Sequence, residues 1–282
     1  MFARKINIEK IKKKIDSLIW YHTLELDEGL VTPGIYDHRP YLDYYGIPED
    51  LKGKRVLDIG AASGFFTFEL EKRGAQVVAT ELPSWFDHDV GPKYVPDKPL
   101  EVLEKYLHEP FLLAKKILKS KAKLKKINIY DLSPKKIGKF DLVFCGSLLL
   151  HLTDPVQALW RIASVTKEMA IIATAIFKEE GKEEIELKQG SEQARDDSRK
   201  NKEVDAIRKG RENVKENCEE KLPFAHFVGE PGGISWWIPN KKCLEAWIEC
   251  AGFSHWRWYS SFRLDYSDGK PGTWHGVVHC YP

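Results

Sequence analysis

The sequence predicts an α/β fold with a doubly wound, mostly parallel β-sheet. From residue 55 onwards, short runs rich in apolar and β-branched residues alternate with stretches of helical periodicity. A glycine-rich turn follows the first of these runs, and Gly74 marks the end of the first helix. Strands that alternate with helices in this way usually form a parallel sheet whose helices cover both faces.

The region 51–282 is expected to form one domain in which strands and helices follow in a regular order. Strands are predicted at Arg55–Ile59, Gln76–Thr80, Lys126–Tyr130, Phe140–Cys145, Ala170–Ile176, Trp256–Leu264 and Trp274–Tyr281. Helices are predicted at Phe65–Arg73, Leu100–Leu118, Pro155–Val165 and Cys243–Cys250. A charged insertion at about 178–230 comes before the last strands, and it is expected to be a solvated helical or partly disordered segment or, alternatively, a mobile lid.

Residues 1–50 are expected to form an N-terminal helix and an aromatic cap. Apolar residues recur at helical spacing among lysines, at Ile8, Ile11, Ile15, Leu18 and Ile19. This pattern predicts an amphipathic helix that packs one face on the rest of the protein. Between Trp20 and Lys54, Tyr, Pro and Gly residues break the periodicity, which indicates turns rather than a continuous element.

Composition excludes several classes of protein. The 282 residues include 44 Lys and Arg against 42 Asp and Glu, so the net charge of +2 lacks the strong basic excess typical of nucleic-acid-binding chains and leaves only a local basic patch open. Five cysteines without a CxxC pair fit neither a disulfide framework nor a zinc site, and no metal is expected. Because no apolar run is long enough to span a bilayer, we expect a cytoplasmic protein without a membrane partner.

The strongest local signal is the run from Val56 to Gly64, which is followed by a helix and by a second strand that ends near Glu81. Gly60 and Gly64 allow a sharp bend from strand to helix and the close approach of a ligand. Glu81 stands where a carboxylate accepts hydrogen bonds from both hydroxyls of a ribose. Asp58 would lie below the loop and orient it. The alternative is a turn that only joins a strand to a helix.

The glycine spacing favours one kind of cofactor. Gly60-x-Ala62-x-Gly64 lacks the full GxGxxG pattern that holds a pyrophosphate, so NAD fits less well than a nucleoside cofactor without phosphate. S-adenosylmethionine contains a ribose and an adenine but no phosphate. It is therefore the expected cofactor.

Several motifs together resemble the Rossmann-like, class I S-adenosylmethionine-dependent methyltransferases. They are Asp58–Gly64, Glu81, Asp131 and Phe140–Gly146. A narrower resemblance runs from about Trp20 to the C-terminus and points to the family of the bacterial tRNA wobble-uridine carboxymethyltransferase. It is carried by Leu148–Pro155, Trp237–Pro239 and Gly252-Phe253. The resemblance implies a Rossmann-like sheet and a transferase that uses S-adenosylmethionine or its carboxylated form.

The resemblance also implies roles for individual residues. The two loop glycines, Gly60 and Gly64, would line the methionine end of the cofactor, and Glu81 would bind its ribose. The residues Asp131 and Leu132 would flank the adenine. Gly146 would place backbone near the sulfonium.

Two departures from the narrower family concern the donor. In the carboxymethyltransferase, a Tyr just before the His of the motif after the fourth strand helps to hold the extra carboxylate of the donor, and this sequence has Leu150 there. The Trp and Lys that also hold that donor have no counterpart in Thr32–Asp37. Ordinary S-adenosylmethionine and simple methyl transfer are therefore expected.

His151 and His22 are the candidate catalytic residues. Methyl transfer to a hydroxyl or a protonated amine needs a group that removes a proton, and an imidazole titrates near neutral pH. His151 follows the fourth strand at the carboxyl edge of the sheet, where ligands bind. A cap of the next helix or a bond to a loop carbonyl is its alternative role. His22 belongs to the aromatic cap, which is positioned to fold over the cofactor.

Other aromatic and basic residues are candidates for ligand contacts. Tyr36 and Arg39 of the cap are expected to stack on the adenine or to grip the methionine carboxylate, with packing and surface roles as the alternatives. Tryptophans that line an acceptor pocket or fill the core are Trp85, Trp236, Trp237, Trp256 and Trp258.

Three functions are consistent with these patterns. The first is methyl transfer from S-adenosylmethionine to an oxygen or nitrogen of a small metabolite or peptide. The second is modification of a tRNA wobble uridine, with phosphate contacts from Lys115, Lys116, Lys121 and Lys125. The third is a non-catalytic partner subunit that keeps the methyltransferase fold. No pattern in the sequence sets the oligomeric state.

Overall fold

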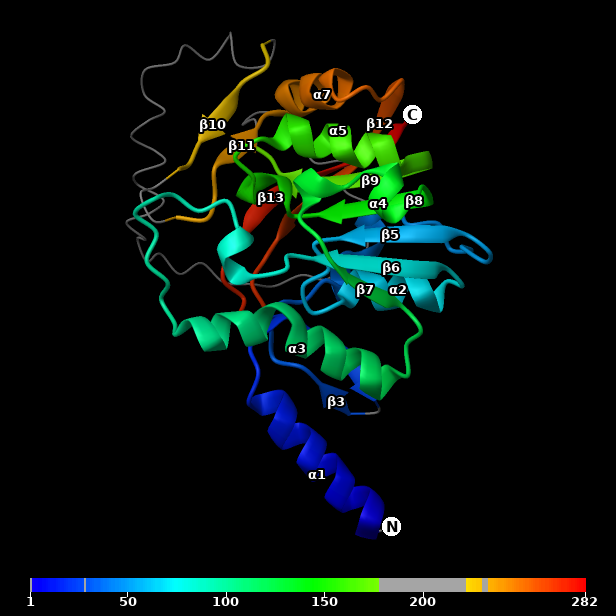
Figure 1. Ribbon diagram of the computed structural model, residues 1–282, viewed down its shortest axis with the longest axis vertical. Coiled ribbons are helices and arrows are strands. Elements are labelled where there is room, and N and C mark those ends of the chain that lie inside the picture. Colours follow the sequence, from blue (N-terminus) through cyan, green and yellow to red (C-terminus); the bar gives the residue numbers. More distant parts are fainter. Residues whose placement is uncertain (1, 28, 178–221, 230–232) are drawn as a thin grey trace, which may run out of the picture.

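The computed structural model describes residues 2–27, 29–177, 222–229 and 233–282, and a seven-stranded β-sheet lies at its centre (Figure 1). The strand order is β12-β13-β9-β8-β5-β6-β7. The bounds are β5 (Arg55–Ile59), β6 (Gln76–Glu81), β7 (Lys123–Lys126), β8 (Phe140–Gly146), β9 (Thr166–Ala175), β12 (His255–Leu264) and β13 (Thr273–Tyr281). β13 is antiparallel to both neighbours, and the other pairs are parallel. The predicted Rossmann-like α/β fold with a mostly parallel sheet is confirmed.

Helices cover both faces of this sheet. Their bounds are α2 (Phe65–Lys72), α3 (Leu100–Leu118), α4 (Pro134–Ile137), α5 (Pro155–Val165) and α7 (Lys241–Cys250). Residues of α2 and α3 share one buried apolar cluster with Val56 of β5. Residues of α4, α5 and α7 share a second cluster with Leu57 of the same strand. Because successive side chains of a strand point to opposite faces, these adjacent apolar residues require helices on both sides of the sheet.

Three parallel strands end together at one edge of the sheet. Ile59, the last residue of β5, pairs with Thr80 of β6 and with Cys145 of β8. The segments that follow these strands therefore start side by side. In open parallel sheets, ligands bind at this carboxyl edge.

The N-terminal helix differs from its prediction. α1 (Phe2–Asp16) is present, but it projects away from the body of the protein (Figure 1). Ile15 is buried, whereas Ile8 is 45% exposed. The lysines at Lys12–Lys14 leave only a narrow apolar stripe, so Ile11 and Ile15 pack against the core while Ile8 does not share the predicted contact.

The cap after α1 contains short strands as well as turns. They are β1 (Trp20–His22), β2 (Glu25–Asp27), β3 (Leu30–Val31) and β4 (Gly34–Tyr36), followed by the 3-10 helix η1 (Arg39–Tyr45). β1 pairs with β4 in parallel, and β2 pairs with β3 antiparallel. Trp20 and Tyr45 are fully buried, so the cap is anchored to the main core.

Most predicted elements agree with the structure to within three residues, and two strands do not, because β9 begins at Thr166 instead of Ala170 and β7 is displaced along the chain. The helices at Leu100–Leu118 and Pro155–Val165 have the predicted bounds. β7 ends at Lys126 instead of Tyr130, because the Asn128 side chain accepts the Tyr130 N–H and caps a 3-10 turn there.

The charged insertion predicted at about 178–230 lies largely outside the described residues. Its described end, from residue 222, enters the antiparallel pair of β10 (Ala225–Phe227) and β11 (Trp237–Pro239).

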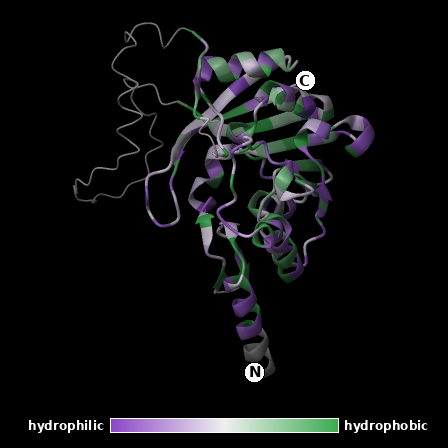
Figure 2. Cartoon of the chain, turned by 60° about the vertical axis from the view of Figure 1, so that its left-hand side comes forward, coloured by the Kyte–Doolittle hydropathy of each residue, from purple (hydrophilic) through white to green (hydrophobic). Residues whose placement is uncertain are grey.

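Hydrophobic residues concentrate on the strands of the sheet, and hydrophilic residues dominate α1 (Figure 2). Within the described part of the chain, no helix combines the length and the apolar character that a membrane crossing requires.

Candidate functional site

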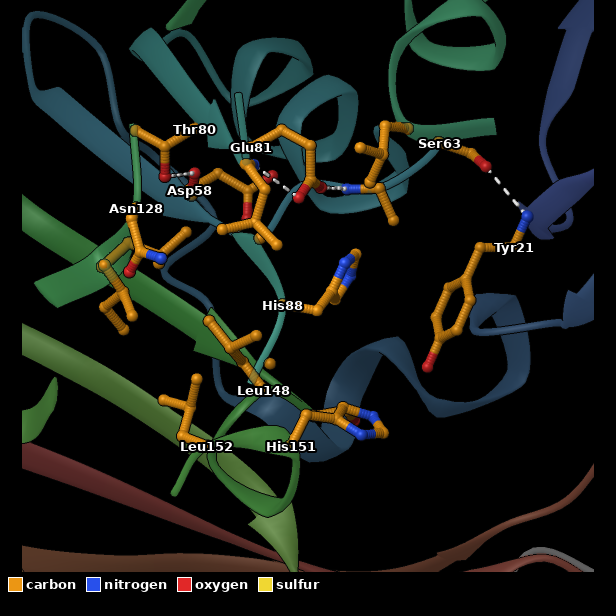
Figure 3. Close-up of a pocket in the computed structure, with 18 of the residues that line it drawn as sticks. Tyr21, Asp58, Ser63, Thr80, Glu81, His88, Asn128, Leu148, His151 and Leu152 are labelled. Carbon is orange, nitrogen blue, oxygen red and sulfur yellow. Dashed lines mark hydrogen bonds between the residues drawn. The ribbon is translucent and has the colours of Figure 1, made fainter. Parts of the chain in front are cut away.

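A cavity lies at the carboxyl edge of β5, β6 and β8 (Figure 3). Its empty volume is about 1340 Å³, counted out to the open mouth. We call one group of its lining residues the loop half: Gly60, Ala62, Ser63, Glu81 and Asn128. We call a second group the histidine half: Tyr21, His22, His38, His88 and His151.

The loop half is shaped by the turn from β5 into α2. The N–H groups of Gly60 and Ala61 both donate to the Thr80 carbonyl, at 3.0 Å each. Gly60 has a φ of 71°, and Ala62 has a φ of 46°. This left-handed conformation costs a non-glycine residue about 1–2 kcal/mol, which the surrounding hydrogen bonds must offset. The turn brings backbone atoms, rather than large side chains, to this wall of the cavity.

Gly64 supports the packing of the loop and is not among the described residues that line the cavity. It is the N-cap of α2 with a φ of 94°. A Cβ at this position would lie 2.6 Å from the Phe68 ring and 2.8 Å from the Phe111 ring. The glycine therefore lets α2 pack closely against α3, and the structure does not bring it to the ligand as predicted.

Glu81 lies at the cavity wall, at the predicted end of the second strand. Its Oε2 accepts the Ala62 N–H at 2.9 Å, and its Oε1 accepts the Leu82 N–H at 2.8 Å. A carboxylate has about four lone-pair positions, so each oxygen keeps another position for a ligand. Burial raises the pKa of Glu81, and the two backbone N–H groups oppose that rise. The arrangement suits a ribose with two hydroxyl donors.

Asp58 lies beneath the loop, as predicted, and is 2% exposed. The Thr67 hydroxyl of α2 donates to its Oδ2. Burial raises the pKa of Asp58 to about 7, and the nearby Glu81 charge adds to that rise. The hydrogen bond to Thr67 ties β5 to the first turn of α2, so Asp58 holds the loop in position.

The residues predicted to flank an adenine lie away from the cavity. Asp131 pairs with Lys136 at 2.7 Å on the surface, and Leu132 is fully buried in the cluster beneath α5. Because β7 ends at Lys126, a 3-10 turn replaces the expected strand end. The residues at the cavity wall are Ile127, Asn128 and Ile129.

Gly146, the last residue of β8, lines the cavity. A Cβ at Gly146 would lie 2.8 Å from the Phe144 ring, so a larger residue would disturb the sheet. Its backbone therefore faces the cavity next to the turn that carries His151.

His151 enters the cavity from the 3-10 turn η4 (Leu149–His151), directly after β8. Its Nδ1 lies 2.8 Å from the Ile234 carbonyl oxygen. A carbonyl oxygen only accepts, so Nδ1 carries the proton and Nε2 keeps its lone pair. Burial lowers the pKa of His151, which keeps the ring neutral near pH 7. None of the described residues hydrogen-bonds to Nε2, so this atom is available to a ligand.

His88 is a lining residue that the sequence did not reveal. Its Nδ1 lies 2.7 Å from the Trp85 carbonyl oxygen, so Nδ1 again carries the proton and Nε2 keeps a lone pair. Burial lowers its pKa as well. His88 and His151 both project into the same space, and Tyr21 faces them from the side (Figure 3).

His22 lines the cavity, as expected, and its environment differs from that of His151. The Phe65 N–H donates to Nδ1 at 3.4 Å, which places the imidazole proton on Nε2. Burial lowers the pKa of His22 to about 3. A lowered pKa weakens a general base, so the structure favours His151 over His22 for this role. His38 packs edge-to-face against it, with ring centroids 5.1 Å apart, and contacts the Tyr45 hydroxyl through Nδ1.

Tyr36 and Arg39 are not brought to the cavity. The Tyr36 ring stacks on Tyr266 at 5.0 Å, and the Arg39 guanidinium pairs with Asp37 at 2.6 Å. The cap instead presents Tyr21, whose N–H donates to the Ser63 hydroxyl at 2.9 Å. Burial raises the pKa of Tyr21 to about 12, so its hydroxyl stays protonated.

Asp89 joins three segments over the histidine half. Its Oδ2 accepts the Tyr130 hydroxyl at 2.6 Å and both the N–H and the hydroxyl of Thr153, at 2.6 and 2.7 Å. The Trp236 indole N–H donates to its carbonyl oxygen at 2.7 Å, and the Trp236 backbone N–H donates to Leu150. These bonds hold the segment that contains Ile234 against η4.

The candidate tryptophans divide between these roles. Trp85 lines the cavity, while Trp236 holds the segment above it. Trp256 and Trp258 pack against the apolar core, and Trp237 donates to the Thr153 carbonyl. Within the described ranges, His, Cys, Asp and Glu residues form no group of three or more that could hold a metal ion.

Comparison with known families gives one domain match. Residues 57–174 match the family model described as a methyltransferase domain. This range contains most of β5 and all of β6 and β8, and with them the whole loop half and His151.

Curated relatives match the same region at low identity. The ubiquinone biosynthesis O-methyltransferases of Xanthomonas oryzae pv. oryzae (strain PXO99A) and Dechloromonas aromatica (strain RCB) are 29% and 28% identical over 126 and 134 residues. These alignments cover 45% and 47% of this chain and 44% and 49% of the relatives. The chain thus spans about half the length of the curated relatives it matches.

Solved structures match almost the whole chain. The N-terminal domain of EvdMO1 in the presence of SAH and D-fucose has a TM-score of 0.56 at 15% identity, with 98% of this chain and 96% of that chain covered. The same domain with SAH bound has a TM-score of 0.55 at 16% identity. At this identity the similarity demonstrates a shared fold.

Proposed function

We propose that the protein transfers a methyl group from S-adenosylmethionine to an oxygen of a small molecule, and the proposal starts from the match of residues 57–174 to a methyltransferase domain. The observation that carries the proposal is the position of His151. Its lone-pair nitrogen faces the same cavity as the donor-binding loop. The narrower resemblance to the carboxymethyltransferase is not supported by the relatives found here, which are named as O-methyltransferases.

The loop half suits the nucleoside part of S-adenosylmethionine. The remaining lone pairs of the Glu81 carboxylate would accept the ribose hydroxyls. Ile127, Asn128 and Ile129 would flank the adenine, in place of the predicted Asp131 and Leu132. The backbone at Gly60 and Gly146 would approach the methionine end. When bound, the cofactor supplies an electrophilic methyl group.

His151 would act as the general base. The hydrogen of an acceptor hydroxyl would pass to its Nε2 while the acceptor oxygen gains the methyl group, so the products are a methyl ether, S-adenosylhomocysteine and an imidazolium that later loses its proton to water. The Ile234 carbonyl favours this role because it accepts the Nδ1 hydrogen and stabilises the imidazolium. General base catalysis of this type typically contributes about 10²–10⁴-fold to a rate.

The names of the curated relatives support oxygen as the methylated atom. Two observations support the ordinary donor. Leu150 stands where the carboxymethyltransferase family has a Tyr, and no Lys or Arg lies among the described lining residues to hold an extra carboxylate. We therefore expect S-adenosylmethionine and S-adenosylhomocysteine to raise the melting temperature, because a ligand of the native state stabilises it. Carboxy-S-adenosylmethionine and NAD are expected to have little effect. A larger increase in melting temperature with the carboxylated donor would contradict the proposal. No increase with any of the four ligands would favour a non-catalytic partner subunit.

A second candidate function, modification of tRNA, is favoured by one feature. Exposed lysines gather along the end of α3 and along β7: Lys116, Lys119, Lys121, Lys123, Lys125 and Lys126. Edge strands often carry lysines to prevent pairing with other sheets, which explains the same residues without RNA. If tRNA binds there, its affinity must fall steeply as salt increases, since each neutralised phosphate releases a counterion. Weak binding that is insensitive to salt would exclude this candidate.

A further inference from the structure

The histidine half presents two histidine side chains with similar hydrogen bonds, at His88 and His151. His88 comes from the loop after β6, and His151 comes from the turn after β8. In both rings, Nδ1 donates to a backbone carbonyl, at 2.7 Å for His88 and 2.8 Å for His151. Each Nε2 is thus left as a hydrogen-bond acceptor, and the part of the chain that the structure describes offers neither of them a donor.

Both nitrogens face the same cavity. His88 and His151 are lining residues, they project into a common space in Figure 3, and the positive form of His88 would disfavour a positive His151. The Nδ1 hydrogen of each ring is bonded to a backbone carbonyl, of Trp85 for His88 and of Ile234 for His151. A ring that turned to donate this hydrogen to a ligand would therefore lose its backbone bond. The two rings therefore form a fixed pair of acceptors.

The charge of the cavity adds a second restriction. Its described lining contains four carboxyl groups, at Asp58, Glu81, Asp87 and Asp89, but no Lys or Arg. Its walls are otherwise mainly apolar and aromatic, with Phe66, Trp85 and Phe144 among them. An anionic group on the acceptor would lose its hydration here without a lysine or arginine to replace it.

We propose that His88 and His151 together select an acceptor that is neutral, planar or largely apolar, and equipped with two hydrogen-bond donors. One hydroxyl donates to His151 and is methylated, and the other donates to His88 and stays unmodified. His88 is then a specificity residue that touches the acceptor. This inference rests on the proposed methyl transfer, because it assumes that the acceptor occupies the histidine half.

The test measures binding to the complex with S-adenosylhomocysteine, so that no turnover is needed. The probes are 1,2-dihydroxybenzene, 1,3-dihydroxybenzene and phenol, because the spacing of the two donors is unknown. We expect at least one dihydroxybenzene to bind about fivefold or more tightly than phenol, which is the net effect of about one added hydrogen bond. Phenol keeps the aromatic ring and one donor, so the ratio isolates the second donor.

Two variants test the role of His88. His88→Phe removes Nε2, and His88→Asn removes Nε2 while its amide N–H still reaches toward the Trp85 carbonyl. Both are expected to bring the ratio close to one without changing the affinity for S-adenosylhomocysteine. The control is His255→Phe, because His255 is exposed at the start of β12 and stacks on Tyr281 at 4.4 Å.

The outcomes separate this inference from the proposed function. If the protein does not bind S-adenosylhomocysteine, the proposed function fails first. If it binds that ligand but binds phenol as tightly as both dihydroxybenzenes, or binds none of the three, the two-donor acceptor is overturned and the donor site stands. A preference that survives in both His88 variants would also overturn the assignment.

Discussion

The loop half and the histidine half of the cavity are built from different kinds of sequence. The loop half comes mainly from one βαβ unit, in which β5, the turn at Gly60 and the end of β6 at Glu81 follow each other within 27 residues, from 55 to 81. The histidine half brings together cap residues such as Tyr21 with His88 and His151, and the Ile234 carbonyl accepts the Nδ1 hydrogen of His151. Backbone hydrogen bonds shape both halves, but in the second they connect segments far apart in the chain.

This difference suggests a division of labour. A cofactor shared by many enzymes is held by a compact unit with a fixed backbone path. An acceptor that differs between enzymes is met by loops, which vary without disturbing the sheet. Variants in the two halves should therefore have separable effects on donor affinity and on acceptor turnover.

The largest effect is expected from His151→Gln. Loss of the basic Nε2 should lower kcat by about 10²–10⁴-fold, the usual contribution of a general base. The affinity for S-adenosylhomocysteine, measured by isothermal titration calorimetry, should stay the same. If donor affinity falls together with kcat, the two halves are not separable.

The pH dependence of the same reaction sharpens this test. Because burial lowers the pKa of His151, the active neutral form should persist below the ordinary value of 6.5. The wild-type kcat/KM should therefore be flat above pH 6.5 and fall only at lower pH. A fall that begins above pH 7 would exclude His151 as the base.

Glu81→Gln should affect the opposite half. The variant replaces the negative carboxylate, which would accept the ribose hydroxyls, with a neutral amide. The amide nitrogen cannot accept a hydrogen bond, so one of the two backbone N–H groups that now donate to Glu81 loses its acceptor. Donor affinity should fall by about 10- to 100-fold. The binding of a phenolic probe at saturating donor should change little. Unchanged donor affinity would place the ribose elsewhere.

Asp58→Asn should change the pH dependence of stability. The folded pKa of about 7 lies above the ordinary 3.8, so the carboxyl favours the folded state at low pH and opposes it as pH rises between these values. The variant should therefore gain stability relative to the wild type from pH 5 to pH 8. Urea unfolding at both pH values measures this difference, and an equal difference at both would contradict the buried, protonated Asp58.

Asp89→Ala should loosen the histidine half. Three donors lose their shared acceptor, so the free energy of unfolding should fall by about 1–3 kcal/mol and Tm by about 2–10 °C. Acceptor KM should rise, while donor affinity stays constant. Asp131→Ala is the matched control, because its exposed pair with Lys136 is worth at most about 1 kcal/mol.

The smallest effect is expected from Arg39→Ala. The guanidinium pairs with Asp37 outside the cavity, at an exposed site. Donor affinity and kcat should stay within about twofold of the wild type, since exposed ion pairs contribute about 0–1 kcal/mol. A large loss of donor affinity would restore the predicted contact with the methionine carboxylate.

The sequence predicted the loop half better than the histidine half for a physical reason. Glycine spacing, an acid at a strand end and strand periodicity are local signals, and they placed Gly60, Asp58 and Glu81 where the structure has them. Gly64 has the predicted backbone conformation but serves helix packing. Asp131 was misplaced because a single asparagine cap shortened β7 and turned the chain before that residue.

The histidine half had no comparable signal. His88 follows the capping box at Ser84, where both hydrogen bonds of the box stabilise the turn, but no pattern indicates that this turn aims its histidine at His151. Likewise, Tyr36 and Tyr21 are equally plausible cap residues in the sequence. Tertiary packing decides that Tyr21 faces the cavity and that Tyr36 stacks on Tyr266.

The bond between His151 and Ile234 has a consequence for how such sites change over time. The partner of the ring is a carbonyl oxygen, which every amino acid provides, so the tautomer of the imidazole does not depend on which side chain stands at position 234. This contact constrains the path of the main chain and does not require a particular amino acid at position 234. Comparisons of sequences alone would pass over position 234, although it governs which nitrogen of His151 is basic.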